Sequence, residues 1–496
     1  MVQTYYNFIN GKWTLSSSGK TFESRNPANP SDVLGKFQKS NARDVQQAVA
    51  AAQTAHKYWS KVPAPKRGEI LLHAAELLKQ EKQRLGRLVT REMGKQFKEG
   101  LGDVQEAIDI AEYMAGEGRR LFGYTTTSEL PDKFCMTIRR PVGVAALITP
   151  WNFPIAIPAW KLMPALICGN AVVLKPSSDT PLCAIELVKI LDKARVPKGV
   201  VNLITGSGEE VGDTLITDPR VHAVSFTGSK AVAEHVTKIA GLKKVGIESG
   251  GKNAIIIMDD ADLKLAVEGV LWGAFGTTGQ RCTACSRVIV HKKVQKQVEA
   301  MLLKELKGLQ IGDGLTCDVG PLVNEKALEK VAEYVKIGQR EGATLLCGGK
   351  PISGKGNKRG YFFDMTIFTN VKPHMRIARE EIFGPVLSII PISTLQEAIQ
   401  VCNNTEYGLS SALYTKNVNQ AFHAIENIEA GITYINSSTI GAEVHLPFGG
   451  IKGTGNGARE AGIEGIHEFS ETKTVYIDYS ERLQKAQIDT ENRDKK

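Results

Sequence analysis

The chain has 496 residues, which is too long for one hydrophobic core and predicts two or three domains. Its apolar content of 42% and charged content of 23% are typical of a soluble globular protein. The net charge of +9 is spread along the chain instead of forming a basic arm interleaved with aromatic side chains, which argues against nucleic-acid binding.

No export signal or membrane span is expected. The first residues carry neither a charged leader nor an apolar core. The most apolar stretch, residues 141–160, contains prolines that favour a buried strand and turn over a spanning helix. Eight cysteines without regular spacing indicate free thiols, so we expect a cytoplasmic protein. Cys282 and Cys285 form a single C-x-x-C without a histidine cluster, which predicts no metal site and leaves redox pairing as the lesser alternative.

Helices and strands follow one another in a recognisable order. Apolar residues recur every three or four positions through residues 42–120, which predicts helices. Residues 124–141 alternate like a hairpin with a turn at Pro131-Asp132. From residue 142, strands alternate with helices, which predicts a parallel, doubly wound sheet. The expected strands are 142–148, 171–174, 200–204 and 223–226. One helix is expected between the first two strands, ending at residue 167, and a second at residues 181–194.

A second α/β unit is expected after residue 282. Its strands are predicted at 288–290, 386–391 and 412–414, and its helices at 294–306, 325–340 and 395–403. Residues 472–479 alternate as an exposed strand that needs a partner, which we expect to come from another subunit. Residues 481–496 mix both charges and are expected to be a solvated tail.

The stretch around Cys282 is the first candidate for chemistry. Small, flexible residues precede it, and Arg281 lies beside it. A free thiol has a pKa of about 8.5, and an adjacent guanidinium would raise the thiolate fraction. The alternative is a small buried hydrophobic side chain, so this stretch alone does not decide between the two.

Polar and small residues gather where the predicted strands end. Parallel sheets bind ligands at the carboxyl ends of their strands. Trp151-Asn152, Lys175 with Ser178, Gly208 and Gly228-Ser229 all fall at such ends. The sequence therefore predicts a ligand site along this edge.

Five motifs together resemble the aldehyde dehydrogenase superfamily, from about Asn10 to Tyr479. They stand in that family's order at residues 150–154 (PWNFP), 226–229 (FTGS), 248–252 (ESGGK), 279–282 (GQRC) and 380–385 (EEIFGP). Residues 441–450 and 454–457 resemble the branch that contains α-ketoglutaric semialdehyde dehydrogenases.

The resemblance implies a two-domain α/β fold with an arm. A doubly wound, Rossmann-like coenzyme-binding domain would comprise residues 1–123 and 142–248, and a second α/β catalytic domain residues 249–450. A β-hairpin oligomerisation arm and tail would comprise 124–141 and 451–496. The implied assembly is a homodimer or homotetramer.

The family's mechanism assigns roles to three residues. Cys282 would attack the aldehyde carbon, and Asn152 with the Cys282 backbone amide would bind the oxyanion. Glu248 would activate the water that hydrolyses the thioester. Taken singly, Asn152 would be read as a turn former and Glu248 as a surface carboxylate.

The coenzyme is expected to be NADP by preference, with NAD possible. Lys175 resembles the adenine-ribose contact, and Ser178 stands where strictly NAD-using members tend to have glutamate. A carboxylate about 4 Å from a 2′-phosphate would cost around 4 kcal/mol at an effective dielectric of 20. Alternatively, Ser178 is only the N-cap of the helix that starts at Pro181.

The remaining coenzyme contacts come from the same resemblance. Ser229 resembles the pyrophosphate contact, Glu381 the nicotinamide-ribose anchor and Phe383 the residue that packs on the nicotinamide. Trp151, Gly208 and Gly228 are expected beside them.

The substrate is expected to be a small anionic aldehyde. Arg281 resembles a position that in several branches holds a remote carboxylate or phosphate. The alternative is a structural arginine tied to backbone or to another carboxylate. A broad-specificity or glyceraldehyde-type dehydrogenase, a coenzyme A-acylating enzyme and a silent homologue are the rival functions, and Glu248 argues against acylation of coenzyme A.

Three positions depart from the family pattern. Ser249 stands where leucine is usual, Ala274 replaces a phenylalanine, and Asp364-Met365 stands where a proline is usual. None of these changes removes a catalytic group.

Overall fold

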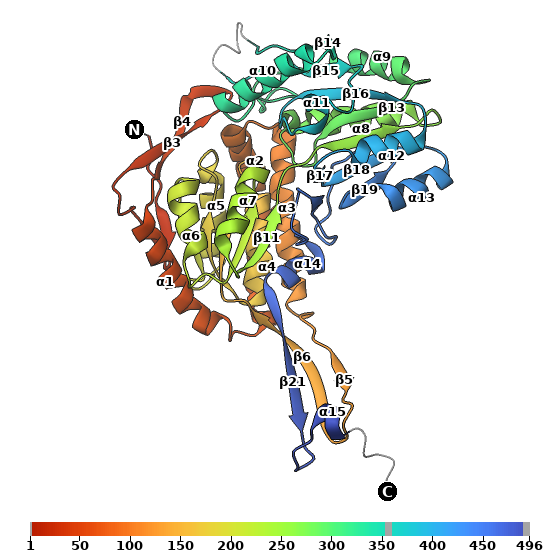
Figure 1. The fold of residues 1–496 in the computed structure, drawn as a ribbon. Coiled ribbons are helices and arrows are strands. Elements are labelled where there is room, and N and C mark those ends of the chain that lie inside the picture. Colours follow the sequence, from red (N-terminus) through yellow and green to blue (C-terminus); the bar gives the residue numbers. More distant parts are fainter. Residues whose placement is uncertain (1, 353–359, 490–496) are drawn as a thin grey trace.

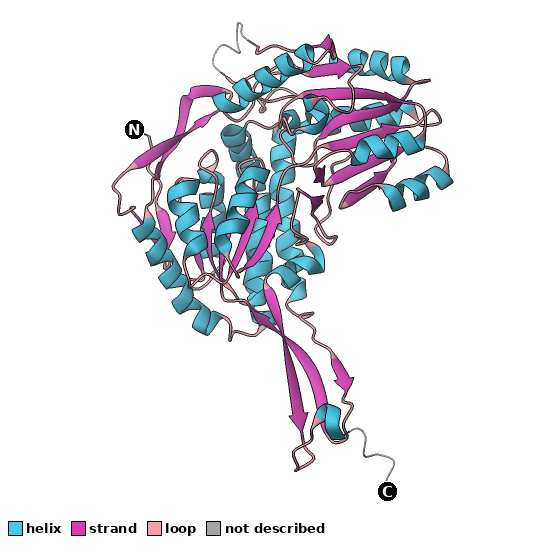
Figure 2. Ribbon diagram, viewed as in Figure 1, coloured by secondary structure: helices cyan, strands magenta, loops and turns pink. Residues whose placement is uncertain are grey.

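The computed structural model describes residues 2–352 and 360–489, and two seven-stranded sheets with helices around them form its body (Figures 1 and 2). A slender three-stranded arm projects from the body (Figure 2). Residues 490–496 of the expected tail lie outside the described part. Among the described residues, no helix has the length and apolarity needed to cross a bilayer.

The first sheet is the predicted parallel, doubly wound sheet. Five parallel strands lie in the order β11-β10-β7-β8-β9, and an antiparallel hairpin, β1 and β2, extends the β9 edge. The chain runs outward in one direction through β7, β8 and β9 and then crosses back to β10 and β11. The strands are β1 (Asn7–Ile9), β2 (Lys12–Thr14), β7 (Val144–Ile148), β8 (Ala171–Lys175), β9 (Val201–Leu203), β10 (Ala223–Thr227) and β11 (Lys244–Glu248).

Helices cover both faces of this sheet because its central strands are apolar on both sides. Every residue of β7 and β8 is buried. Helices α4 and α5 pack with α2 and α3, and α1 contacts α6, which in turn contacts α7. The helices are α1 (Ala42–Trp59), α2 (Ala64–Met93), α3 (Phe97–Glu117), α4 (Ala156–Cys168), α5 (Pro181–Lys193), α6 (Asp213–Thr217) and α7 (Lys230–Ala240). Another hairpin, β3 (Thr21–Asn26) with β4 (Asn29–Gln38), precedes them.

The second sheet has the order β14-β15-β16-β13-β12-β18-β19 and is parallel except for β14. Its strands are β12 (Asn253–Ile257), β13 (Cys285–His291), β14 (Thr344–Cys347), β15 (Thr366–Thr369), β16 (Val386–Ile392), β18 (Ser410–Tyr414) and β19 (Ile432–Ile435). Its helices are α8 (Leu263–Phe275), α9 (Gln295–Leu306), α10 (Glu325–Arg340), α11 (Arg376–Arg379), α12 (Leu395–Asn403) and α13 (Val418–Asn427). The predicted helices 325–340 and 395–403 are confirmed at both ends.

The arm adds a pairing that the sequence did not predict. Strand β21 (Ser470–Asp478) pairs antiparallel with β6 (Lys133–Pro141) of the same chain from Ser470↔Pro141 to Asp478↔Lys133, and a partner from another subunit on its other edge stays a prediction. The expected hairpin is confirmed, since β5 (Thr125–Thr127) pairs with the other edge of β6. The local alternation identified the strand, but a partner more than 300 residues upstream carries no local signal.

Residues between the second sheet and the arm return to the body. Strand β20 (Ile451–Lys452) pairs with β17 (Tyr407–Gly408), and α14 (Gly462–Glu468) packs against α4. Only β21 and the short α15 (Ala486–Asp489) belong to the arm in this part of the chain (Figure 1). The predicted domain boundaries stay a prediction. In the described part of the chain, the arm contains β5, β6, β21 and α15 (Figure 1).

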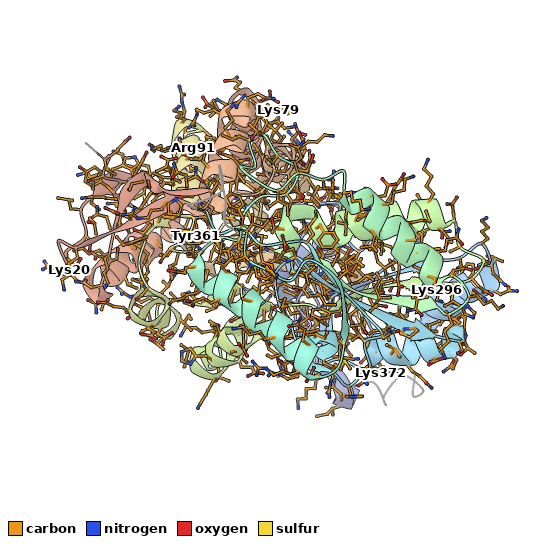
Figure 3. All side chains as sticks on the ribbon, turned by 90° about the horizontal axis from the view of Figure 1, so that it is seen from above. Lys20, Lys79, Arg91, Lys296, Tyr361 and Lys372 are labelled. Carbon is orange, nitrogen blue, oxygen red and sulfur yellow. The ribbon has the colours of Figure 1, made fainter. Side chains whose placement is uncertain are left out.

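The positive charge is distributed over the surface. Lys20, Lys79, Lys296 and Lys372 are exposed and lie at separate points of the periphery (Figure 3). This arrangement matches the even spread of lysine along the sequence.

Candidate active site

The ends of several strands meet between the two sheets. Asn152 lies in the loop after β7, and Glu248 is the last residue of β11. Cys282 precedes β13 of the second sheet. Asn152 and Cys282 line one cavity of about 240 Å³, and Glu248 and Cys282 line another of about 70 Å³. The fold thus brings the other two expected catalytic side chains, Asn152 and Glu248, around the Cys282 thiol.

A strained turn presents the thiol. Thr277, Thr278 and Gly279 have φ values of 51°, 59° and 69°, so three successive residues are left-handed. The Asn253 side-chain amide then donates to the Cys282 carbonyl at 2.7 Å. This anchoring positions the Sγ atom where the two cavities adjoin.

Burial keeps the free thiol protonated. Burial first, and then the carboxylates of Glu381 and Glu248, together raise the pKa of Cys282 to about 12. The expected activating cation is directed elsewhere, because Arg281 Nη2 lies 2.6 Å from Glu99 Oε1. The prediction that Arg281 makes the thiol more acidic therefore finds no support in the free protein.

Glu248 is a buried carboxyl without a hydrogen-bond partner on either oxygen among the described residues. Burial, and then the charge of Glu460, raise its pKa well above the usual value for glutamate. Gly449 leaves room for it, since a Cβ at that position would lie 2.2 Å from Glu248 Oε1. Such a carboxyl can exchange protons with a reacting molecule in the same cavity.

The departure at Ser249 has a structural explanation. Its Oγ donates to the Gly453 carbonyl at 2.7 Å, and its backbone N–H donates to Thr454 O at 2.6 Å. These two bonds fix the backbone directly after Glu248. The serine therefore ties the strand end to the loop at residues 453–454.

Asn152 is buried beside the thiol, and its Oδ1 has no partner among the described residues. Its amide lines the 240 Å³ cavity that also contains Cys282. An amide donor at this place can stabilise an oxyanion formed on a carbon bound to Sγ.

The same cavity has the features of a nicotinamide site. Phe383 packs edge-on against Trp151 with ring centroids 5.4 Å apart. Glu381 Oε1 accepts a hydrogen bond from the Gly251 N–H at 2.9 Å, which orients the carboxylate. Gly228 and Ser229 lie at the N-terminus of α7, where backbone N–H groups favour phosphate. A flat ring, a ribose acceptor and a phosphate cradle thus fit a dinucleotide.

Lys175 and Ser178 lie at the end of β8, and Gly208 follows the end of the neighbouring strand β9. Burial lowers the pKa of Lys175 to about 8, and its Nζ donates to the Pro176 carbonyl at 3.1 Å. Ser178 Oγ donates to Gly206 O at 3.1 Å. Ser178 is not the helix cap, because Thr180 occupies the N-cap of α5. Gly208 begins a π-helical turn, Gly208–Gly212, that passes beside the Lys175 side chain.

Comparison with known proteins identifies this arrangement. Residues 13–475 match the sequence profile described as the aldehyde dehydrogenase family. The chain belongs to the aldehyde dehydrogenase family. It is therefore an NAD(P)-dependent oxidoreductase that oxidises a small aldehyde.

Curated relatives match this aldehyde dehydrogenase over nearly its full length. α-Ketoglutarate semialdehyde dehydrogenase of Haloferax volcanii is 44% identical over 95% of the chain and 99% of the relative. α-Ketoglutaric semialdehyde dehydrogenase of Bacillus subtilis is 41% identical over 96% and 98%. 2,5-Dioxopentanoate dehydrogenase of Saccharolobus solfataricus is 41% identical over 95% and 99%.

Solved structures confirm the fold of this aldehyde dehydrogenase. Betaine aldehyde dehydrogenase of Staphylococcus aureus, crystallised with NAD+, superimposes with a TM-score of 0.94 at 34% identity, covering 97% of this chain and 96% of that one. An NAD-dependent aldehyde dehydrogenase of Sinorhizobium meliloti gives a TM-score of 0.94 at 35% identity, over 98% and 96%.

Arg281 lies in the wall of the 70 Å³ cavity that contains Cys282, but its guanidinium is already paired with Glu99. Besides Glu99, its Nε donates to Thr277 Oγ1 at 2.9 Å, and its guanidinium lies 5.5 Å from the centre of the Phe153 ring. Pairing with a carboxylate was one of the alternatives for this residue. Its position beside the cavity also keeps it within the aldehyde's surroundings.

Sequence motifs did not identify several residues of the site. Glu99 and Glu106 come from α3 and line the cavity next to Arg281. Lys161 and Glu460 form a buried ion pair in the thiol's surroundings, and Glu460 shares a cavity with Glu248. The available signal was a charged residue on a helix, Lys161 on the apolar α4 and Glu99 on α3. Their partners lie more than 170 residues away in the sequence, so the sequence did not show the pairing.

Proposed function

We propose that this enzyme oxidises α-ketoglutaric semialdehyde (2,5-dioxopentanoate) to the dicarboxylic acid. Three relatives with 41–44% identity over at least 95% of this chain carry the name of that activity, and this observation carries the proposal. The position of Arg281 in the wall of the cavity with Cys282 supports it, because a guanidinium pairs well with a distal carboxylate.

Cys282 is the proposed nucleophile and Asn152 the proposed oxyanion donor. Cys282 loses its proton to solvent water and, as thiolate, attacks the aldehyde carbon to give a thiohemiacetal, whose oxyanion accepts hydrogen bonds from the Asn152 amide and the Cys282 N–H. Such a donor lowers the barrier by roughly 3 kcal/mol. The bound nicotinamide coenzyme supplies the hydride acceptor. Loss of hydride leaves a thioester on Cys282.

Glu248 is the proposed base of the second half-reaction. It accepts a proton from a water molecule in the 70 Å³ cavity, and the hydroxide attacks the thioester carbon. Collapse of that adduct breaks the carbon–sulfur bond and releases the carboxylic acid, and the leaving thiolate takes the proton back from Glu248 to restore the thiol.

The proposed preference is for NADP over NAD. Ser178 has a hydroxyl where a carboxylate would repel a 2′-phosphate. Lys175, three residues earlier at the end of β8, supplies a positive charge. The other proposed coenzyme contacts are Trp151, Gly208, Gly228, Ser229, Glu381 and Phe383.

The test is a steady-state screen of α-ketoglutaric semialdehyde, glyceraldehyde and simple aldehydes with each coenzyme. We expect the highest kcat/KM for the semialdehyde with NADP, with a free acid as product even when coenzyme A is present. In Ser178→Glu, kcat/KM with NADP should fall about 100-fold or more, consistent with a repulsion of a few kcal/mol. A parent enzyme that prefers glyceraldehyde, or a Ser178→Glu variant with an unchanged coenzyme ratio, would contradict the respective assignment.

A further inference from the structure

A large outer cavity adjoins the inner cavity that holds the thiol. The outer cavity measures about 710 Å³ and the inner one about 70 Å³. Glu106, Phe153, Arg281 and Gly441 line both cavities. An aldehyde whose carbonyl reaches Cys282 therefore has its far end beside these four residues.

Helix α3 presents a row of carboxyl groups to this junction. Glu99, Asp103 and Glu106 follow one another at intervals of four and three residues, which places them on one helix face. Two of these carboxylates form ion pairs: Arg281 Nη2 lies 2.6 Å from Glu99 Oε1, and Lys95 Nζ lies 2.9 Å from Asp103 Oδ2. Among the described residues, no hydrogen bond or ion pair reaches the third carboxyl, Glu106.

The surroundings of Glu106 favour its neutral form. Burial raises the pKa of this carboxyl to about 7, with Asp103 and Asp109 acting in the same direction and Lys95 and Arg281 opposing them. Other charged or titratable groups line the two cavities, namely Lys98, Glu99, Glu268, Glu305 and Asp318 on the outer side and Glu248, Cys282 and Glu460 on the inner side. Near neutral pH, a proton is therefore available on Glu106 for a hydrogen bond.

We propose that Glu106 is a specificity-determining residue whose neutral carboxylic acid donates a hydrogen bond to the distal carboxylate of the aldehyde, beside the positive charge of Arg281. This inference rests on the proposed function, in that it takes the substrate to be an anionic aldehyde. A protonated carboxyl is a strong donor to a carboxylate, whereas an ionised one repels it. The substrate's far end supplies the partner that Glu106 lacks within the chain.

The test compares an anionic and a neutral aldehyde of equal length as pH changes. Glutaric semialdehyde and pentanal are assayed between pH 6 and pH 8, and the ratio of their kcat/KM values is followed. Because titration of Cys282 and Glu248 affects both substrates, it cancels in this ratio. We expect the ratio to fall roughly tenfold over this range in the parent enzyme, as a group with a pKa near 7 loses its proton.

Glu106→Gln should remove this pH dependence, because the amide donates a hydrogen bond at every pH. Glu106→Leu should give a ratio that is equally flat but lower at pH 6, since it has no donor. Glu268→Gln, which removes a carboxylate from the exposed side of the outer cavity, is the matched control and should retain the tenfold fall.

A parent enzyme with a flat ratio, or a Glu106→Gln variant that keeps the fall, would overturn the role of Glu106. If α-ketoglutaric semialdehyde proves a poor substrate while glutaric semialdehyde shows the Glu106-dependent fall, this inference stands and only the proposed substrate fails. If the enzyme oxidises pentanal and no anionic aldehyde, both are wrong.

Discussion

The Glu248 carboxyl and the Cys282 thiol line one small cavity, and neither is stabilised as an anion there. Burial and neighbouring carboxylates raise the pKa values of both Cys282 and Glu248. Each group therefore holds its proton more tightly than usual and, once ionised, is a stronger base. This arrangement suits a residue that must take a proton in one step and release it in another.

Glu248→Gln should separate the two half-reactions. The amide cannot accept a proton from water, so kcat should fall by about 10²–10⁴ while the first equivalent of reduced coenzyme still forms. Intact-mass spectrometry should show an acyl adduct that is absent from Cys282→Ala. In the parent, the hydrolysis rate should rise with pH through the raised pKa of Glu248, since the ionised form is the base. A glutamine variant with the parental kcat would contradict the assignment.

The residues with distinctive chemistry were predictable, and their ionic partners were not. Cys282, Glu248 and Asn152 are in motifs whose order the sequence shows directly, and the fold places all three around one cavity region. The partner of Arg281 is Glu99, which lies 182 residues upstream on a helix that looked ordinary. A pairing of this kind depends on how two domains pack, which local sequence patterns do not encode.

At the scale of elements, Asp103 connects α3 to the beginning of α4. Its Oδ2 lies 2.9 Å from the buried Lys95 ammonium, and its Oδ1 accepts from the N–H groups of Ile155 and Ala156 at 3.2 and 2.7 Å. The first turn of α4 has no side-chain cap of its own. A carboxylate from another helix therefore supplies the missing acceptor close to Asn152.

Asp103→Ala should destabilise the protein by about 3–5 kcal/mol, because it leaves a buried ammonium and two backbone donors without partners. A thermal unfolding scan should show a clear drop in Tm. Asp109→Asn on the same helix, whose carboxylate accepts only from Gln105 in the described structure, should change Tm little. Equal Tm values for the two variants would refute the bridging role.

Periodicity predicted most elements well and failed where a strand's partner was remote. The amphipathic pattern located α10 and α12 with correct ends, because each buries a face within its own domain. Strand β21 was recognised, but its pairing with β6 of the same chain was not, and a partner from another subunit on its other edge stays a prediction. Pairing between distant segments follows from the path of the whole chain.

At the scale of the whole molecule, the arm has the properties of an assembly surface. Tyr124 and Tyr476 are 74% and 66% exposed on it, and β5 leaves one backbone edge without a partner strand in the described structure. Exposed aromatic rings and an open sheet edge favour association with another copy. We therefore expect a homodimer or homotetramer.

Tyr476→Glu should weaken that assembly by placing a charge among apolar side chains. Size-exclusion chromatography with light scattering should give a smaller mass for this variant than for the parent. Lys20→Glu is the control and should keep the parental mass, because this exposed residue directly precedes β3, which lies away from the arm (Figure 1). A monomeric parent, or an unaltered mass for Tyr476→Glu, would show that the arm has another purpose.

The central claim is that one sulfur atom carries the acyl group while the coenzyme accepts the hydride. The most direct measurement is the rate of aldehyde-dependent coenzyme reduction by Cys282→Ala, with coenzyme binding measured in parallel. We predict that reduction falls to the background rate while coenzyme affinity stays close to that of the parent. Aldehyde oxidation by Cys282→Ala at the parental rate would contradict the account.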